Sequence, residues 1–136
     1  MPNHHPRIVV IEDNPLVRTG QRMLLEVVGY RVAEIAAPAD LANFVSTSDT
    51  DQAIIADFDL GQGMTGLEVA LEIMRRAGEQ IPTLILSASF GERSLAAAAE
   101  YDMPVMFKPV PEEEVLAWVA KALDQRRQRA RTTAEP

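Results

Sequence analysis

The stretch AIIADFDLGQG, residues 53–63, is an apolar run that stops abruptly at acidic side chains. Ile54 and Ile55 belong to a short apolar segment, and Asp57 and Asp59 stand at its end. Strands that are apolar on both faces are typical of parallel sheets covered by helices on each side. A protein core excludes unpaired charge. The two acidic residues therefore predict that this strand ends at an edge of the sheet that carries a functional site.

Strand and helix patterns alternate on both sides of this stretch. Short β-branched runs predict strands and apolar residues at helical spacing predict helices, the first of which has Asn14 and Pro15 at its start. The predicted strands cover residues 7–12, 30–36, 52–57, 81–89 and 104–107. The predicted helices cover residues 14–29, 38–46, 66–78, 92–101 and 111–128, and a flexible tail is expected over residues 128–136.

The alternation of five strands with five helices predicts an α/β fold. Right-handed crossovers leave few arrangements, and the leading one is a flavodoxin-like (βα)5 doubly wound parallel sheet with strand order 2-1-3-4-5. The length of 136 residues suits one compact domain. With no repeat, linker or second domain in view, we expect residues 1–136 to form a single domain whose core covers about residues 6–127.

Composition and charge exclude several classes of function. The net charge is −7, from 20 acidic and 13 basic residues, which argues against general nucleic-acid binding and suits a cation or a basic partner. The absence of cysteine excludes disulfides and thiol chemistry. No apolar run approaches the ~20 residues that span a bilayer, and residues 1–7 lack the apolar region of a signal peptide. We therefore expect a cytoplasmic protein that binds neither membranes nor nucleic acid.

The carboxyl ends of the predicted strands carry acidic residues, a serine and a lysine, which are the residues most able to bind a ligand or to react. In a doubly wound sheet, ligands bind beyond the carboxyl ends of the strands, near the point where the strand order reverses. Crowded carboxylates repel one another unless a cation lies between them, and Mg2+ prefers oxygen ligands. A lysine and a hydroxyl nearby would hold a phosphoryl oxygen, so the set indicates phosphoryl transfer onto a carboxylate. The residues are Glu12, Asp13, Asp57, Asp59, Ser87 and Lys108.

Four segments of the sequence resemble the receiver domain of two-component response regulators. They are VVIEDN (9–14), IIADFDLGQGMTGLEVA (54–70), PTLILSAS (82–89) and FKPV (107–110), at the expected strand ends and in the expected order. The resemblance covers roughly residues 6–127. PTLILSAS is especially similar to receivers attached to hybrid histidine kinases, although with no output domain visible we expect a single-domain response regulator.

The resemblance implies a role for each acidic residue. Asp57 would accept a phosphoryl group from a phosphohistidine. Asp13 would bind Mg2+ directly, Glu12 would bind it directly or through water, and Asp57 and the backbone carbonyl of Asp59 would complete the protein ligands. The pair Glu12–Asp13 replaces the commoner pair of aspartates. The segment LGQG (60–63) lacks the usual proline, so that loop is expected to be more mobile.

Two residues on later strands also receive roles from the resemblance. Ser87 would hydrogen-bond the phosphoryl group and move on activation. Lys108 would pair with a phosphoryl oxygen and, before phosphorylation, with the acids. Family members usually have a cis peptide where this chain has Lys108–Pro109.

The chain departs from the family at its conformational switch. An aromatic residue normally stands three residues before the lysine, where this chain has Val105, and Phe107 is expected on the opposite face of the strand. Valine has few rotamers and little volume to transfer. The switch is therefore expected to run through residues 87–94, where Phe90 supplies bulk and Gly91 permits movement.

The implied partners are proteins. A sensor histidine kinase or a histidine phosphotransfer protein would donate the phosphoryl group. A downstream protein target would bind the face made by residues 92–101, 104–107 and 111–128. The protein is expected to be a monomer or a weak dimer, and to catalyse only its own phosphorylation and dephosphorylation.

Three alternatives stay open at the level of sequence. Haloacid-dehalogenase-type phosphatases also end a strand in D-x-D, as at Asp57 and Asp59, but they place their Mg2+ acids after the lysine, whereas Glu12 and Asp13 come first here. A degenerate receiver would act as an interaction module without phosphorylation. A flavin- or nucleotide-binding protein of this fold would need a glycine loop after the first strand, which the sequence lacks.

Overall fold

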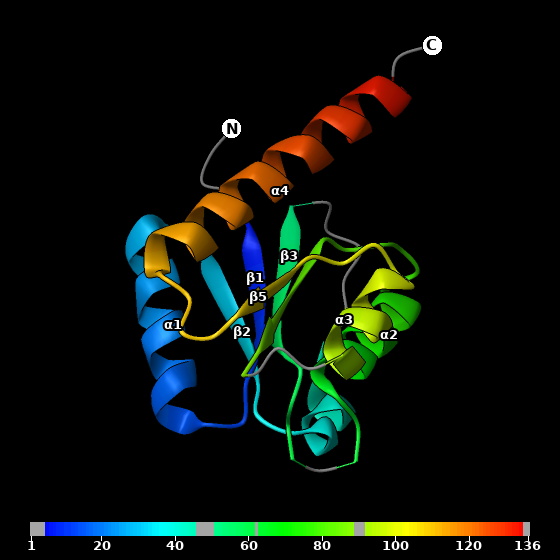
Figure 1. The fold of residues 1–136 in the computed structure, drawn as a ribbon. Helices are drawn as coiled ribbons and strands as arrows, with labels where there is room; N and C mark the ends of the chain where they lie inside the picture. Colours follow the sequence, from blue (N-terminus) through cyan, green and yellow to red (C-terminus); the bar gives the residue numbers. More distant parts are fainter. Residues whose placement is uncertain (1–4, 46–50, 62, 89–91, 135–136) are drawn as a thin grey trace.

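Five parallel strands form one sheet in the order β2-β1-β3-β4-β5 (Figure 1). The structure is a computed structural model that describes residues 5–45, 51–61, 63–88 and 92–134, with side chains as far as residue 129. The expectations about Phe90 and Gly91 therefore fall outside the described residues. The observed order confirms the predicted flavodoxin-like (βα)5 arrangement. The strands are β1 (Arg7–Ile11), β2 (Arg31–Ile35), β3 (Gln52–Asp57), β4 (Thr83–Ser87) and β5 (Val105–Phe107).

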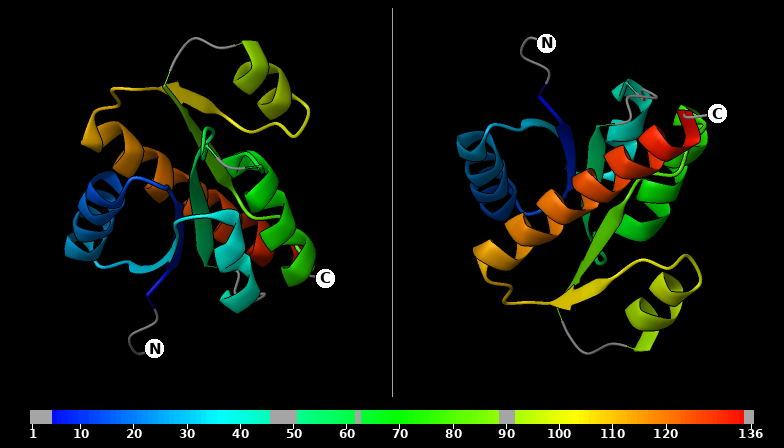
Figure 2. Two further views of the ribbon diagram at one scale, coloured as in Figure 1. Left: turned by 90° about the horizontal axis from the view of Figure 1, so that it is seen from below. Right: turned by 90° about the horizontal axis from the view of Figure 1, so that it is seen from above.

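Helices cover both faces of the sheet (Figure 2). Helices α1 and α4 lie on one face, and η1, α2 and α3 lie on the other. In the part of the chain that the structure describes, no helix is both long and apolar enough to cross a membrane. The helices are α1 (Pro15–Val28), the 3-10 helix η1 (Pro38–Asn43), α2 (Gly66–Ala77), α3 (Glu92–Ala99) and α4 (Glu112–Ala134).

The core is split into two layers by the sheet. Ile54 on β3 packs in the layer beneath η1, α2 and α3, whereas its neighbour Ile55 packs in the layer beneath α1 and α4. Val9 and Val10 on β1 divide in the same way. Successive side chains of a strand point to opposite faces, so a strand sandwiched between helices must be apolar at every position.

Side-chain caps define where the helices next to the central strands begin. The Asn14 side-chain oxygen accepts the backbone N–H groups of Leu16 at 2.9 Å and Val17 at 3.2 Å, which confirms the predicted start of α1. Thr65 and Glu68 form a reciprocal capping box at the start of α2. The caps therefore fix where each helix begins: Asn14 stands three residues after the end of β1, and Thr65 stands eight residues after the end of β3.

The segment predicted as a helix over residues 38–46 is a 3-10 helix that ends at Asn43. The Asp40 carboxylate accepts the backbone N–H groups of Ala36 at 2.8 Å and Ala37 at 3.1 Å. Such local hydrogen bonds tie the chain into a tight turn and compete with a longer α-helix.

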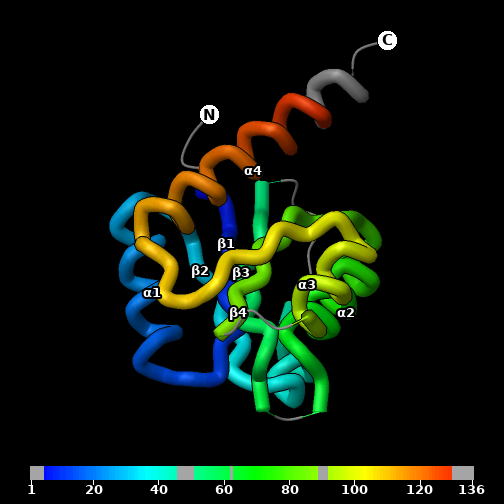
Figure 3. The backbone as a smooth tube through the Cα atoms, in the orientation of Figure 1, coloured from blue at the N-terminus to red at the C-terminus, as the bar shows by residue number. Residues whose placement is uncertain are grey.

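The predicted helix end near residue 128 is wrong, because α4 continues to Ala134 (Figure 1). Figure 3 traces the earlier part of the same helix, in orange and red. The segment QRRQRAR (125–131) consists of good helix formers, and no glycine or proline interrupts it. Ion pairs from Arg126 to Glu79 and from Arg127 to Asp51 also hold this part of α4 beside the amino end of β3. The last turns therefore gain both local propensity and tertiary contacts.

The expectation that Phe107 and Val105 lie on opposite faces of β5 is wrong. Residues two apart in a strand point to the same face. Val105 packs against the core layer beneath α2 and α3, while Met106 packs against the opposite layer. Phe107, which stands opposite Ser87 in the ladder, therefore belongs to the α3 side of the sheet.

Candidate functional site

Three acidic side chains converge at the carboxyl edge of the sheet, as the sequence predicts. Glu12 and Asp13 follow β1, and Asp57 ends the neighbouring strand β3. One carboxylate oxygen from each lies within 4.8 Å of the others. Glu12 and Asp57 are buried, with exposed fractions of 2% and 6%, while Asp13 is exposed and leaves the cluster open to solvent.

Lys108 brings a positive charge to the acids from the end of β5. Its Nζ lies 3.1 Å from Asp57 Oδ2 and 3.5 Å from Glu12 Oε1. The backbone N–H of Lys108 donates to the carbonyl of Ser87 at 2.8 Å, which continues the β4–β5 ladder to the site. The predicted cis peptide between Lys108 and Pro109 is present.

The surroundings of the site shift the pKa values of Glu12 and Lys108. The pKa of Glu12 is raised from 4.5 to about 7, and burial of the carboxyl group is the largest cause. The backbone N–H of Asn14, 3.1 Å from Glu12 Oε2, opposes this rise, the charge of Asp57 adds to it, and Lys108 opposes it. Burial disfavours the charged form of Lys108, but Asp57 and Glu12 outweigh this and raise the pKa of the ammonium group.

Backbone and arginine contacts fix the two acidic strand ends. The Asp59 N–H donates to Asp57 Oδ1 at 3.3 Å, whereas the Asp59 side chain itself is exposed. Arg18 on α1 donates to the carbonyl of Glu12 at 2.9 Å and to that of Asp13 at 3.4 Å. Sequence reasoning missed Arg18. Its position one helical turn after the Asn14 cap was the available signal.

Ser87 lies buried at the end of β4, and its hydroxyl accepts a hydrogen bond from Ser94 on α3 at 3.2 Å. Ser94 is also buried and was not predicted as part of the site. A serine in the alanine-rich segment SLAAAA (94–99) was the only sequence signal for it. The contact depends on how α3 packs against β4, which helical periodicity does not specify.

Gly66, the first residue of α2, lies directly against the backbone of Asp57. A Cβ atom added to Gly66 would be 1.9 Å from the Asp57 carbonyl oxygen. The Gly66 N–H donates to the carbonyl of Phe58 at 3.0 Å. Sequence reasoning included this glycine in a motif without assigning it a role. The structure shows that only glycine allows α2 to start so close to β3.

The acidic cluster fits a small divalent cation. Octahedral Mg2+ holds oxygen ligands at about 2.0–2.1 Å, so ligands on opposite sides of it stand about 4.2 Å apart. The oxygens of Glu12, Asp13 and Asp57 lie within 4.8 Å of one another, so one ion could reach all three after small side-chain movements. Hard carboxylate oxygens are the donors that Mg2+ prefers. The donor set therefore suits a small divalent cation such as Mg2+.

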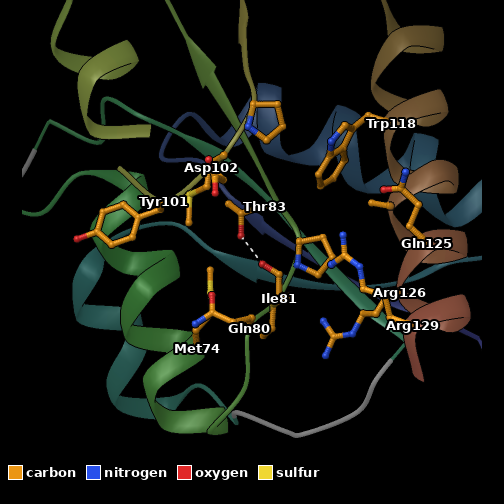
Figure 4. Close-up of a pocket in the computed structure, with 14 residues that line it drawn as sticks. Met74, Gln80, Ile81, Thr83, Tyr101, Asp102, Trp118, Gln125, Arg126 and Arg129 are labelled. Atoms are coloured by element: carbon orange, nitrogen blue, oxygen red, sulfur yellow. Dashed lines mark hydrogen bonds between the residues drawn. The ribbon is translucent and has the colours of Figure 1, made fainter. Parts of the chain in front are cut away.

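A separate pocket lies near the start of β4, away from the acidic edge at its other end (Figure 4). It has a volume of about 450 Å3 and lies among the end of α2, the segment before β5, and α4. The Thr83 hydroxyl in its wall donates to the Ile81 carbonyl at 2.9 Å. Trp118 and Arg126 of α4 also line it, and Arg126 is already paired with Glu79. The pocket contains none of the residues that the sequence marks as the site.

The fold and site together define a class of protein: doubly wound α/β domains with a cluster of acidic side chains and a lysine at the carboxyl edge of the sheet. Residues 8–120 match the family described as the response regulator receiver domain. The chain therefore belongs to the receiver domain family of two-component signalling. This confirms the resemblance drawn from the sequence, while the likeness to hybrid kinase receivers stays a prediction.

Relatives of known name agree with this assignment. The response regulator MprA of Mycolicibacterium vanbaalenii is 36% identical over 115 residues, which cover 82% of this chain and 47% of that protein. The phyllosphere-induced regulator PhyR of Methylorubrum extorquens is 26% identical over 117 residues, 85% of this chain and 43% of that protein. The chain thus spans about half the length of these curated relatives.

Solved structures support the fold. The signal receiver domain of a putative Luxo repressor protein from Vibrio parahaemolyticus superposes with a TM-score of 0.79 at 18% identity, covering 97% of this chain and 100% of that one. A CheY-like response regulator receiver domain protein from Methanospirillum hungatei gives a TM-score of 0.77 at 17% identity, covering 93% and 99%. The match to the receiver domain family favours neither the phosphatase alternative nor the degenerate receiver.

Proposed function

We propose that this receiver domain accepts a phosphoryl group on Asp57 from a phosphohistidine, in a reaction that depends on Mg2+. The observation that carries the proposal is the convergence of Glu12, Asp13 and Lys108 around the Asp57 carboxylate. A carboxylate placed among oxygen ligands and a lysine is suited to in-line attack on phosphorus.

In the proposed reaction, Asp57 is the only residue of this protein that forms a covalent bond to the phosphoryl group. A carboxylate oxygen of Asp57 attacks phosphorus, an oxygen–phosphorus bond forms, and the bond from phosphorus to the histidine nitrogen breaks. The electron pair of that bond leaves with the imidazole, which takes up a proton from solvent. The product is an acyl phosphate on Asp57, and water later attacks its phosphorus to release inorganic phosphate and restore the carboxylate.

The surrounding residues would divide the work. Glu12, Asp13, Asp57 and the backbone carbonyl of Asp59 would hold Mg2+, which neutralises charge on the phosphoryl oxygens when bound. Lys108 would pair with a phosphoryl oxygen, a role supported by the contacts of its ammonium group with Asp57 and Glu12. The hydroxyl of Ser87 would donate to another phosphoryl oxygen.

The proposed partners follow from this role. A sensor histidine kinase or a histidine phosphotransfer protein would supply the phosphoryl group in the cytoplasm. A downstream protein would read the face formed by α3, β5 and α4, on which Leu95 and Tyr101 are exposed. Catalysis would be limited to the domain's own phosphorylation and dephosphorylation, and the domain would act as a monomer or a weak dimer.

The test is covalent labelling with a small phosphodonor. Wild-type protein with Mg2+ should gain one phosphoryl group by intact-mass measurement, in an acyl phosphate that hydroxylamine cleaves, and a chelator should prevent the gain. Asp57→Asn should abolish labelling. Asp59→Asn is the matched control, because it changes an exposed side chain two residues away and keeps the backbone carbonyl. Wild-type labelling of Asp57→Asn, or equal loss in both variants, would refute the assignment.

A further inference from the structure

A pair of hydroxyl groups joins the end of β4 to the first turn of α3. Ser94 Oγ donates to Ser87 Oγ at 3.2 Å, and each of the two residues is only 2% exposed. Ser87 is the last residue of β4, and Ser94 is the third residue of α3. The pair therefore links a strand end at the acidic edge to a helix of the proposed output face.

Packing alone does not explain a serine at position 94. The other buried residue of α3 is Ala98, and Ala97 packs against the same core layer. Alanine is the better helix former, and a buried hydroxyl costs free energy unless it is hydrogen-bonded. The Ser94 hydroxyl is therefore explained by the hydrogen bonds it makes, of which the one to Ser87 reaches the site.

The direction of this hydrogen bond is compatible with the proposed role of Ser87. A serine hydroxyl can donate one hydrogen bond and accept two. Because Ser94 is the donor, its bond does not use the hydrogen that Ser87 would donate to a phosphoryl oxygen. Hydrogen bonds arranged in such a chain polarise one another and strengthen the whole.

We propose that Ser94 is the positioning residue for Ser87, and the route by which a phosphoryl group on Asp57 is sensed by α3. The proposal rests on the proposed function, since it requires that phosphoryl group. When Ser87 turns towards the phosphoryl oxygen, its bond to Ser94 draws the first turn of α3 with it. The guanidinium of Arg93, 5.9 Å from the centre of the Phe58 ring, keeps the same turn next to the residue that follows Asp57.

Val105 on the neighbouring strand β5 is less suited than Ser94 to transmit a conformational change from Ser87. Val105 on β5 is half-buried, and a valine side chain has one strongly preferred rotamer and little volume to move. A change at Ser87 therefore reaches the output face more directly through Ser94 and α3 than through the side chain of Val105.

The test compares amide chemical shifts with and without beryllofluoride, a phosphoryl mimic, in the presence of Mg2+. In the wild type, the amides of Arg93 and Ala96 should shift together with the amide of Asp59, which donates to Asp57. In Ser94→Ala, the Asp59 response should persist, while the α3 responses should fall by at least about twofold, as for groups in one hydrogen-bond network.

A double-mutant cycle separates the hydrogen bond from general damage to α3. If the bond carries the effect, Ser94→Ala should change nothing further in protein that already carries Ser87→Ala. Glu92→Gln, which changes an exposed residue of the same turn, should keep the wild-type response. An unchanged α3 response in Ser94→Ala, or additive losses in the cycle, would overturn this proposal and leave the proposed function standing. If beryllofluoride caused no shift of the Asp59 amide in the wild type, both this proposal and the proposed function would be overturned.

Discussion

The lack of a side chain at Gly66 sets the distance between α2 and β3. Gly66 begins α2, and a Cβ atom there would overlap the Asp57 carbonyl oxygen at 1.9 Å. Backbone atoms of a central strand cannot move aside as the end of a flexible side chain can. The position of the candidate phosphoacceptor therefore depends on a residue that carries no chemistry of its own.

We expect Gly66→Ala to lower the free energy of unfolding by about 3 kcal/mol, because overpacking against the backbone forces α2 or β3 to shift. Phosphoryl labelling of Asp57 should fall in the protein that remains folded. Urea unfolding monitored by the fluorescence of Trp118, the single tryptophan, measures the change in stability.

Gly20→Ala is the control for this substitution. Gly20 lies inside α1, and a Cβ atom there would meet nothing within 4 Å. Since alanine is the better helix former by about 1 kcal/mol, this variant should be neutral or slightly more stable. Equal losses of stability in the two glycine variants would contradict the argument from close approach.

At the scale of elements, α4 is held at two places along its length. Its apolar side packs on the sheet through Val115, Val119 and Leu123. Further along, Arg126 pairs with Glu79 and donates to the carbonyl of Gln52 at 3.4 Å. The second contact ties the helix to the start of β3 and to the connection between α2 and β4.

Two adjacent arginines of α4 should therefore contribute unequally to stability. The Arg126 side chain is 11% exposed and its partner Glu79 21%, so Arg126→Ala would leave a partly buried carboxylate without its cation, with the hydrogen bond from Gln52 remaining, and should cost about 2 kcal/mol. The Arg127 side chain is 45% exposed beside Asp51, so Arg127→Ala should cost less than about 1 kcal/mol. Urea unfolding of the two variants measures the difference, and equal losses would show that α4 is not anchored at Arg126.

At the scale of the whole molecule, the acidic cluster links the stability of the fold to pH. Folding raises the pKa of Glu12 from 4.5 to about 7. Between these values the folded state keeps a proton that the unfolded chain has lost. The contribution of Glu12 to the free energy of unfolding is therefore greatest below pH 4.5 and is lost as the pH rises to about 7.

This linkage should appear as a difference between two proteins. Without Mg2+, wild-type protein should lose stability relative to Glu12→Gln as the pH rises across that window, by up to about 3 kcal/mol at roughly 1.4 kcal/mol per pKa unit. Saturating Mg2+ should stabilise the wild type above pH 7, because the cation binds the folded carboxylates. Thermal unfolding at several pH values measures both effects. Parallel pH profiles for the two proteins would contradict the assignment to Glu12.

Much of the site followed from the sequence because parallel strands deliver their carboxyl ends to one edge. Once strands ending near residues 12, 57, 87 and 107 are placed in one sheet, their terminal side chains must meet. The convergence of Glu12, Asp13, Asp57 and Lys108 was therefore predictable without coordinates. The Asn14 cap was equally predictable, since its contacts lie within one helical turn.

By itself, then, the sequence determined the alternation of strands and helices, the cover of helices on both faces of the sheet and the acids at the strand ends, because periodicity and strand ends are local properties of the chain. Only the tertiary structure decided that Ser94 reaches Ser87, that Gly66 lies against Asp57, and that Arg126 anchors the long α4. These contacts join residues on different elements. They depend on the distances and angles at which helices pack on the sheet, which no local pattern encodes.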